Sequence, residues 1–212
     1  MSLTLPKGIQ FGFASLLDSP SAVTGFTSAD PAIATGSTVA AGSVVVVGSN
    51  GWPILNNRVS VVGDADELLG IDTTEAALFP GTSGAGTLRV AGDFTNFTQQ
   101  GDPTTSGGEQ QFWNGILLED PLGRQISLPT FKNAKTLTIP LYYDADEPWY
   151  KAAQVVDARG EPVVLRARML NGDALYWYGY LSFDADPSMA SNTPMGNTAV
   201  FTIIGASTLV KA

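Results

Sequence analysis

The sequence predicts a mainly β fold, a two-sheet antiparallel β-sandwich or barrel with one short α-helix. Three observations carry this prediction: short apolar runs split by glycine-rich breaks, period-two alternation in the second half, and a single apolar stripe with helical spacing. The 212 residues include 23 glycines and 13 prolines, which suits many short strands joined by turns. A chain of this length fits one β domain.

The first half of the chain contains two segments that differ in composition. Residues 1–38 are rich in Ser, Ala and Pro, which predicts a flexible, irregular N-terminal arm. Residues 39–212 predict a single β-sandwich domain with a long loop around 75–110. Within it, Val44–Val47 is typical of the short apolar runs that we interpret as strands. Asp64–Gly70 fits either a capped helix start or a strand, because periodicity over so few residues does not decide.

Residues 135–143 predict a half-buried strand, because apolar and polar side chains alternate along them. Thr136 and Thr138 fall on the side opposite the leucine and isoleucine side chains. Pro140 has no N–H to donate to a neighbouring strand. The strand is therefore expected to be an edge at that point or to carry a bulge.

A short amphipathic helix is predicted next. Asp146 is the expected N-cap, Glu147 and Pro148 fit the first turn, and Gly160 fits the end. Between them, apolar residues recur at i, i+3, i+4 and i+7. These residues are Trp149, Ala152, Ala153 and Val156.

Asn171-Gly172 predicts a hairpin turn between the strands Val163–Leu170 and Ala174–Asp184. The final strand, Thr198–Ile204, is apolar on both faces. On the second hairpin strand, three tyrosines share one face. With Trp177 beside them they fit a sugar- or base-stacking platform, but a core face plus a face that meets a neighbouring subunit is favoured, because aromatic residues are enriched in interfaces.

Seven residues are the candidates for a polar sheet face or interface. Arg166 and Arg168 lie two apart on one strand, which fits inter-subunit ion pairs or, more simply, a solvated surface. The full set is Thr136, Thr138, Arg166, Arg168, Tyr176, Tyr178 and Tyr180.

Composition excludes most catalytic chemistry. There is no Cys and no His, which removes thiolate nucleophiles and the commonest general base and metal ligand. The acidic clusters at 64–67, 144–147 and 184–186 lack the calcium-loop pattern and are interpreted as turns and caps. No catalytic, metal or cofactor-binding residue is predicted. The net charge of -9 disfavours specific nucleic-acid binding, and no apolar run approaches the ~20 residues that span a membrane.

Several segments, taken in order, resemble the major tail tube proteins of siphophages, the bacteriophages with long non-contractile tails. The resemblance covers about residues 40–205 and depends on order and spacing more than on any one motif. Its segments are Gly51–Val62, Leu69–Thr74, Gly107–Phe112 and, above all, Leu137–Gly205.

This resemblance implies a tail-tube-like fold and a structural protein of the virion tail, not an enzyme. Subunits of the family form hexameric rings that stack around a tape measure protein, and DNA later passes through the lumen without specific binding. Tail terminator and baseplate proteins are further implied partners, and assembly takes place in the host cytoplasm. Residues 1–35 and 75–110 are the implied arm and loop that contact the neighbouring ring.

Two other functions stay open at this point. A carbohydrate- or receptor-binding β-sandwich module of a phage fibre or baseplate would use the aromatic run. A carboxylate-dependent hydrolase would use two of the acidic residues. Among phage structural proteins, a tail terminator or baseplate hub has a related fold, but a terminator would cap a tube without polymerising.

Overall fold

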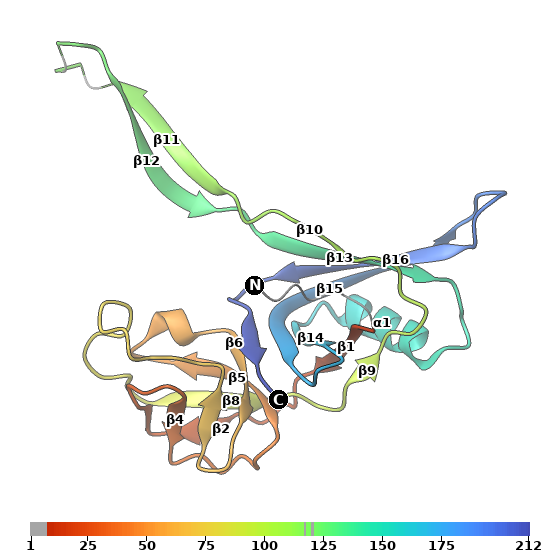
Figure 1. The fold of residues 1–212 in the computed structure, drawn as a ribbon, viewed down its shortest axis with the longest axis horizontal. Coiled ribbons are helices and arrows are strands. Elements are labelled where there is room, and N and C mark those ends of the chain that lie inside the picture. The colour runs from red at the N-terminus through yellow and green to blue at the C-terminus, as the bar shows by residue number, and fades with distance from the viewer. Residues whose placement is uncertain (1–7, 117, 120) are drawn as a thin grey trace.

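A computed structural model describes residues 8–116, 118–119 and 121–212 of the chain. These residues form an eight-stranded sheet, a seven-stranded sheet and a separate two-stranded hairpin (Figure 1). Every strand pairing between them is antiparallel, and the described residues contain a single α-helix, α1 (Pro148–Arg159). The predicted mainly β fold with one short helix is confirmed.

The eight-stranded sheet has the order β10-β13-β16-β15-β14-β1-β9, with β17 beside the first part of β15. Its inner face is a continuous apolar core. Leu137, Phe201 and Leu181 lie opposite one another on three adjacent strands and are almost fully buried. Burying a side chain of this kind stabilises the fold by about 1.5–3 kcal/mol. The strands are β1 (Gln10–Ser15), β9 (Thr95–Asn96), β10 (Thr104–Ser106), β13 (Lys135–Tyr142), β14 (Val163–Arg168), β15 (Ala174–Ser188), β16 (Gly196–Ile203) and β17 (Thr208–Val210).

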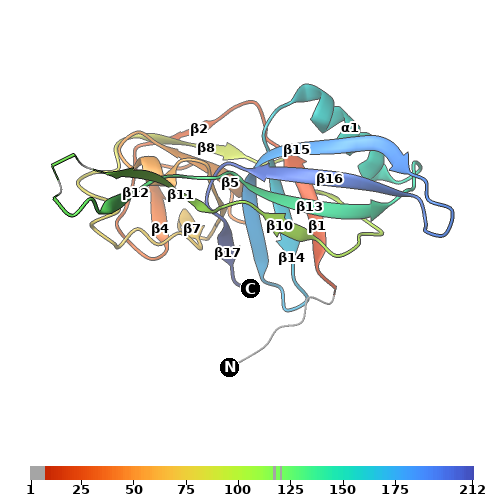
Figure 2. The ribbon, with the colours of Figure 1, turned by 90° about the horizontal axis from the view of Figure 1, so that it is seen from above.

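Helix α1 covers this core (Figure 2). Trp149 is fully buried, and its indole N–H donates to the Thr98 hydroxyl at 2.9 Å. Gly160 ends the helix in a left-handed conformation, as predicted. The N-cap lies one residue later than predicted, at Glu147, because a residue that precedes a proline avoids the helical region: Glu147 is extended, with a ψ of 137°, and Pro148 begins the helix.

Two further predictions about the second half are confirmed. The Asn171-Gly172 turn joins β14 and β15, and Gly172 has a φ of 94°, which favours glycine. Pro140 lies beyond the end of β10, so its missing N–H faces no strand partner. Its carbonyl instead accepts the N–H of Gly101 at 2.8 Å.

The seven-stranded sheet has the order β2-β8-β5-β6-β7-β4-β3 and encloses its own apolar core. The prediction of an irregular arm over residues 1–38 is wrong for residues 10–35, which form β1 to β4, and residues 1–7 lie outside the described part of the chain. The ambiguous segment 64–70 contains a strand. The strands are β2 (Ser21–Val23), β3 (Gly25–Phe26), β4 (Ala32–Thr35), β5 (Val44–Ser49), β6 (Arg58–Val62), β7 (Glu67–Leu69) and β8 (Gly86–Val90), with a 3-10 turn at Pro53–Leu55.

The seven-stranded sheet is inserted between β1 and β9, which are neighbours in the other sheet. The chain leaves β1 and returns to β9 at one place: Leu17 N–H donates to the Val90 carbonyl and Gly92 N–H to the Ser15 carbonyl, both at 2.8 Å. A third apolar cluster joins the two sheets. Val46 and Val59 of the inserted sheet there pack with residues of β14 and β15.

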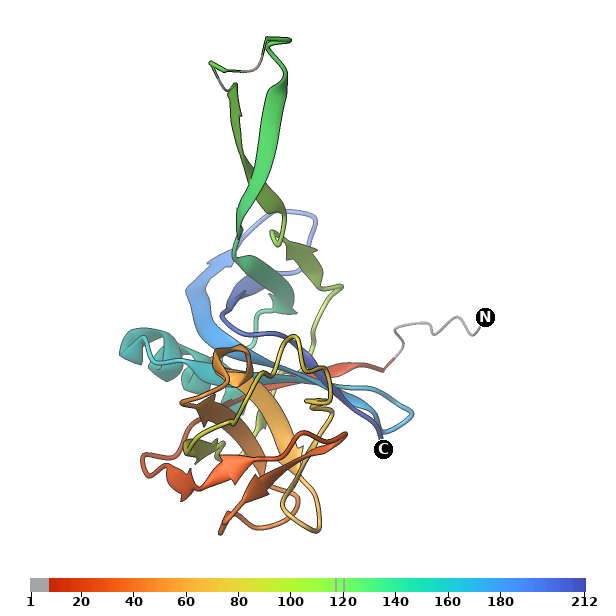
Figure 3. The same cartoon turned by 90° about the vertical axis from the view of Figure 1, so that its left-hand side faces the viewer.

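The two-stranded hairpin, β11 (Gln110–Ile116) and β12 (Gln125–Lys132), extends away from both sheets (Figure 3). The sequence predicts a long loop at 75–110 instead. That stretch contains β8, β9 and β10, so the segment that protrudes is the one that follows it. The long protruding segment of this chain is therefore residues 110–132 and not the predicted loop.

Candidate functional site

Alternation of side chains along the strands gives the eight-stranded sheet an outer face opposite its apolar core. Side chains opposite those of the apolar core point outward from β10, β13, β16 and the second part of β15. We call this surface the open face. It consists of Thr104, Ser106, Thr136, Thr138, Pro140, Tyr142, Thr198, Val200, Thr202, Tyr180, Ser182 and Asp184.

Strand register arranges hydroxyl groups of the open face in rows. In one row, Thr136 lies between Ser106 and Thr202, and the Ser106 and Thr136 hydroxyls are 2.7 Å apart. Asp184 is the only charged member of the face. A surface of this kind offers hydrogen-bonding groups without the cations that attract phosphates.

The structure separates the predicted site residues into two groups. Thr136 and Thr138 lie on the open face. Arg166 lies on β14 in the other half of the sheet, with its guanidinium carbon 4.1 Å from the centre of the Phe94 ring. Its guanidinium also donates to the Asn96 side-chain oxygen at 3.2 Å. Arg166 therefore helps to fix the segment that leads from the inserted sheet into β9. Arg168 is exposed near the hairpin turn.

The three tyrosines share one face of β15 but not one environment. Tyr176 and Tyr178 are each 6% exposed because the inserted sheet packs on them, whereas Tyr180 is 46% exposed. Burial raises the pKa of both covered phenols. The nearby positive charge, Arg166 at Tyr176 and Arg89 at Tyr178, lowers the pKa and only partly offsets the effect of burial. This differs from the sequence prediction: the chain itself covers two of the three, and Tyr180 alone stays available to a neighbouring subunit.

Sequence reasoning missed most of the open face. The clearest missed signal is in the last long strand, where Thr198 and Thr202 alternate with the buried Ala199 and Phe201. The sequence prediction that this strand is apolar on both faces is therefore wrong, because its two threonines have strand periodicity. Thr104 and Ser106 follow a proline in a segment interpreted as a loop, so no periodicity was available there.

The hairpin carries apolar side chains on both faces. Trp113 lies opposite Leu128 on one face, and Phe112 lies opposite Pro129 on the other. Lys132 is the only charged residue of the two strands. Five large apolar side chains are each more than half exposed: Phe112, Trp113, Ile116, Leu128 and Phe131. A two-stranded hairpin with this surface is marginal in water by itself, so it indicates a contact with other molecules.

The acidic clusters serve local structure. Asp144 accepts the N–H of Asp146 and the side-chain amide of Gln99, both at 3.2 Å. Asp184 accepts the N–H of Asp186 at 3.0 Å. Among the described residues, no three acidic side chains come together in a group that could hold a metal ion. In the same part of the chain, no helix has the length and apolar character that crossing a membrane requires.

Comparisons with known proteins include solved structures and a family model. The chain is similar to subunits in two solved structures of gene transfer agent particles. The first, the tail of an empty particle computed with C6 symmetry, has a TM-score of 0.40 and 14% identity over 57% of this chain and 88% of the other. The second, the virion of the native particle, has a TM-score of 0.40 and 13% identity over 55% and 88%. A search of curated proteins finds no match.

The family comparison is the decisive one. The family model described as phage tail tube protein matches residues 50–212, which is well over half of the chain. The match includes the open face, the hairpin, helix α1 and the long β15 strand. The chain therefore belongs to the phage tail tube protein family, as a structural subunit of the tube.

Proposed function

We propose that copies of this chain close into hexameric rings, that the open face lines the channel, and that stacked rings conduct DNA. The observation that carries the proposal is the open face itself. It is a broad, hydroxyl-rich surface with one carboxylate, and it lies between two sheet edges that have no strand partner in the described residues.

The two edges differ, which supports a head-to-tail contact between copies. One edge is β10, whose outer side is unpaired in the described chain. The other is the second part of β15, where side chains of α1 bond to the backbone. Asp157 accepts the N–H of Phe183 at 3.3 Å, and the Tyr150 hydroxyl donates to the Ala185 carbonyl at 2.9 Å. In the proposed ring, β10 of one copy faces the β15 and α1 side of the next.

The charge balance supports passage of DNA without capture. A protein that binds DNA neutralises phosphates with Lys and Arg, whereas the open face has no cation and the whole chain carries a net charge of -9. Repulsion between such a wall and the phosphates keeps the polyanion mobile. The tape measure protein, tail terminator and baseplate remain the proposed partners, with assembly in the host cytoplasm and no catalytic activity.

The main alternative, a carbohydrate- or receptor-binding module, loses its principal support. It relied on the aromatic run of β15 as a stacking platform. Tyr176 and Tyr178 are buried under the inserted sheet, and Trp177 packs against the core on the opposite face. Tyr180 alone is a poor platform, because stacking sites combine several exposed rings.

Electron microscopy of concentrated purified protein, with light scattering for mass, tests the proposal. We expect hollow rings or tubes for the natural chain and for Thr138→Lys, a substitution on the open face. Tubes of Thr138→Lys should retain DNA at low salt and release it at high salt, while tubes of the natural chain should not retain it. Thr35→Lys, on the inserted sheet, is the matched control and should behave as the natural chain. Discrete trimers without a lumen would refute the ring, and equal DNA retention by both Lys variants would refute the channel-lining role.

A further inference from the structure

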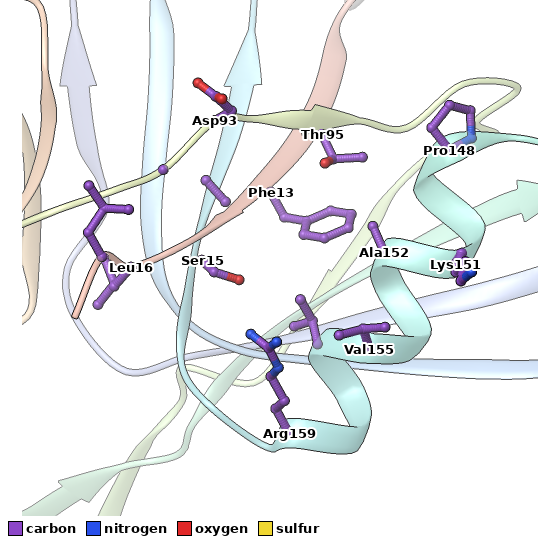
Figure 4. A pocket seen from close by; sticks show the side chains of 14 residues that line it. Phe13, Ser15, Leu16, Asp93, Thr95, Pro148, Lys151, Ala152, Val155 and Arg159 are labelled. Atoms are coloured by element: carbon purple, nitrogen blue, oxygen red, sulfur yellow. The ribbon is translucent and has the colours of Figure 1, made fainter.

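A groove lies between helix α1 and the strands β1 and β9 (Figure 4). It has a volume of about 500 Å³ and mostly apolar walls, which include Phe13 and Ala152. Leu17 is 52% exposed and Val155 is 43% exposed in this groove. The volume is within the range of sites that enclose a sizeable ligand, roughly 300–1,000 Å³, so it can take several aliphatic side chains.

The groove carries an excess of positive charge. Lys151 and Arg159 lie on the exposed side of α1, and Asp93 is the one carboxylate among the lining residues. The chain as a whole is acidic, with 11 Lys and Arg residues against 20 Asp and Glu residues. Two cations beside an apolar groove are therefore unusual for this surface, and they favour an occupant that is both apolar and acidic.

The distal end of the β11–β12 hairpin has this chemistry. Ile116 is 63% exposed, and the Leu118 side chain is fully exposed next to the exposed Glu119. The sequence between the two strands adds Asp120 and one cation, Arg124, so the distal end carries the opposite charge excess to the groove. In Figure 1 the hairpin extends away from α1, so a hairpin reaches a groove of this kind only on another copy.

The hairpin is built to make contacts through its faces and tip rather than its edges. Pro129 removes one backbone N–H from β12, and the register shifts between Gln110 and Phe112. Prolines and irregularities of this kind prevent edge-to-edge strand pairing. Strands of seven and eight residues extend the tip by about 24 Å at 3.4 Å per residue. This reach carries the tip well clear of its own subunit.

We propose that the distal end of the hairpin of one copy docks in the α1–β1 groove of a second copy. Leu118 and Ile116 pack against Leu17 and Val155, and Glu119 lies near Lys151 and Arg159. This contact rests on the proposed stacking of rings, and it is the surface through which a subunit of one ring would bind a subunit of the next.

Cysteine cross-linking tests the contact directly, because the natural chain has no cysteine. A variant with Leu118→Cys and Val155→Cys is assembled, oxidised and run on a denaturing gel. We expect covalent ladders of linked subunits. The matched control combines Val155→Cys with Leu170→Cys, a leucine at the β14–β15 turn that is 78% exposed, and should stay monomeric on the gel.

Each outcome has one meaning. Tubes that form without cross-links would overturn the docking site while leaving the proposed tube intact. Natural protein that never forms rings or tubes would instead overturn the proposed function. Ladders from Val155→Cys combined with Met189→Cys, in place of Leu118→Cys, would assign the groove to the exposed loop at 189–195.

A charge swap keeps the test valid if the cysteine variants assemble poorly. Glu119→Lys is expected to lower polymer yield roughly tenfold, the effect of about 1.4 kcal/mol per contact. Combining it with Lys151→Glu and Arg159→Glu should restore the yield. Glu161→Lys, just beyond α1, is the control and should leave the yield unchanged, with circular dichroism to verify folding. Failure of the combined variant to recover, with its fold intact, would overturn the pairing.

Discussion

Tyr178 and Tyr180 point the same way from one strand, yet the chain buries the first and exposes the second. The eight-stranded sheet thus has two outer regions. The covered region, on β14 and the first part of β15, contacts the inserted sheet through Val164, Tyr176 and Tyr178. The open face continues from it along β15 without a break in alternation. The two regions differ in what packs on them. A tyrosine therefore belongs to the core between the sheets in the covered region and to the exposed surface on the open face.

The largest expected difference comes from placing a charge in each region. Val164 is fully buried in the covered region, and Val200 is half-buried on the open face. Val164→Asp should lower the free energy of unfolding by about 3–5 kcal/mol, because its carboxylate would be buried without a partner. Val200→Asp should cost less than about 1 kcal/mol, since water reaches it. Urea unfolding of the two variants measures this, and equal losses would mean that the two regions are not distinct.

Removing a tyrosine ring should have a smaller effect in the same direction. Tyr178→Ala leaves a cavity between the two sheets, and we expect it to cost about 3 kcal/mol. Tyr180→Ala removes a ring that is already 46% exposed and should stay within about 0.5 kcal/mol in the isolated subunit. Thermal unfolding of both variants against the natural chain gives the comparison. A Tyr180→Ala loss as large as that of Tyr178→Ala would contradict it.

The smallest expected effect concerns alkaline pH. Burial raises the pKa of Tyr176 and Tyr178 in the folded chain, so their contribution is fully present below the unfolded value of about 10 and is lost as pH rises through the folded pKa. The neighbouring charges are Arg166 and Arg168 at Tyr176, and Arg89 at Tyr178; Tyr180 also acts on Tyr178.

A variant with Tyr176→Phe and Tyr178→Phe sharpens this point. It should lose less stability above pH 10 than the natural chain and should match its pH dependence below pH 9. Chemical unfolding over this range measures the slope. If the free energy of unfolding has the same pH dependence in both proteins above pH 10, burial does not raise the pKa of these two phenols in the folded chain.

Local signals predicted the second half of the fold well. The stripe of Trp149, Ala153 and Val156 marked the helix, and Asn171-Gly172 marked the hairpin, because both depend on residues close in sequence. The inserted sheet was harder to predict. Its strands have two to six residues and pair across long separations, as between β2 and β8 or β4 and β7. Such pairing has no local periodicity to reveal it.

The candidate site was predictable only in part for the same physical reason. Alternation placed Thr136 and Thr138 on a polar face, since the strand itself determines that. It could not distinguish Tyr176 from Tyr180, because the side chains that cover Tyr176 come from residues distant in sequence, such as Val59 and Phe94. Arg166 likewise faces Phe94, a partner that sequence spacing does not indicate.

The adjacent points at which the chain leaves β1 and returns to β9 have a consequence for how related chains diverge. A gene segment for residues 18–89 can be exchanged, shortened or duplicated while Leu17 and Val90 stay hydrogen-bonded neighbours, provided that the new segment still covers Val164, Tyr176 and Tyr178. Such a change replaces a complete sheet together with its core. The strands of the open face lie elsewhere in the chain and keep their register. Chains that share this architecture can therefore differ greatly in length and in the inserted sheet while the open face keeps the same dimensions.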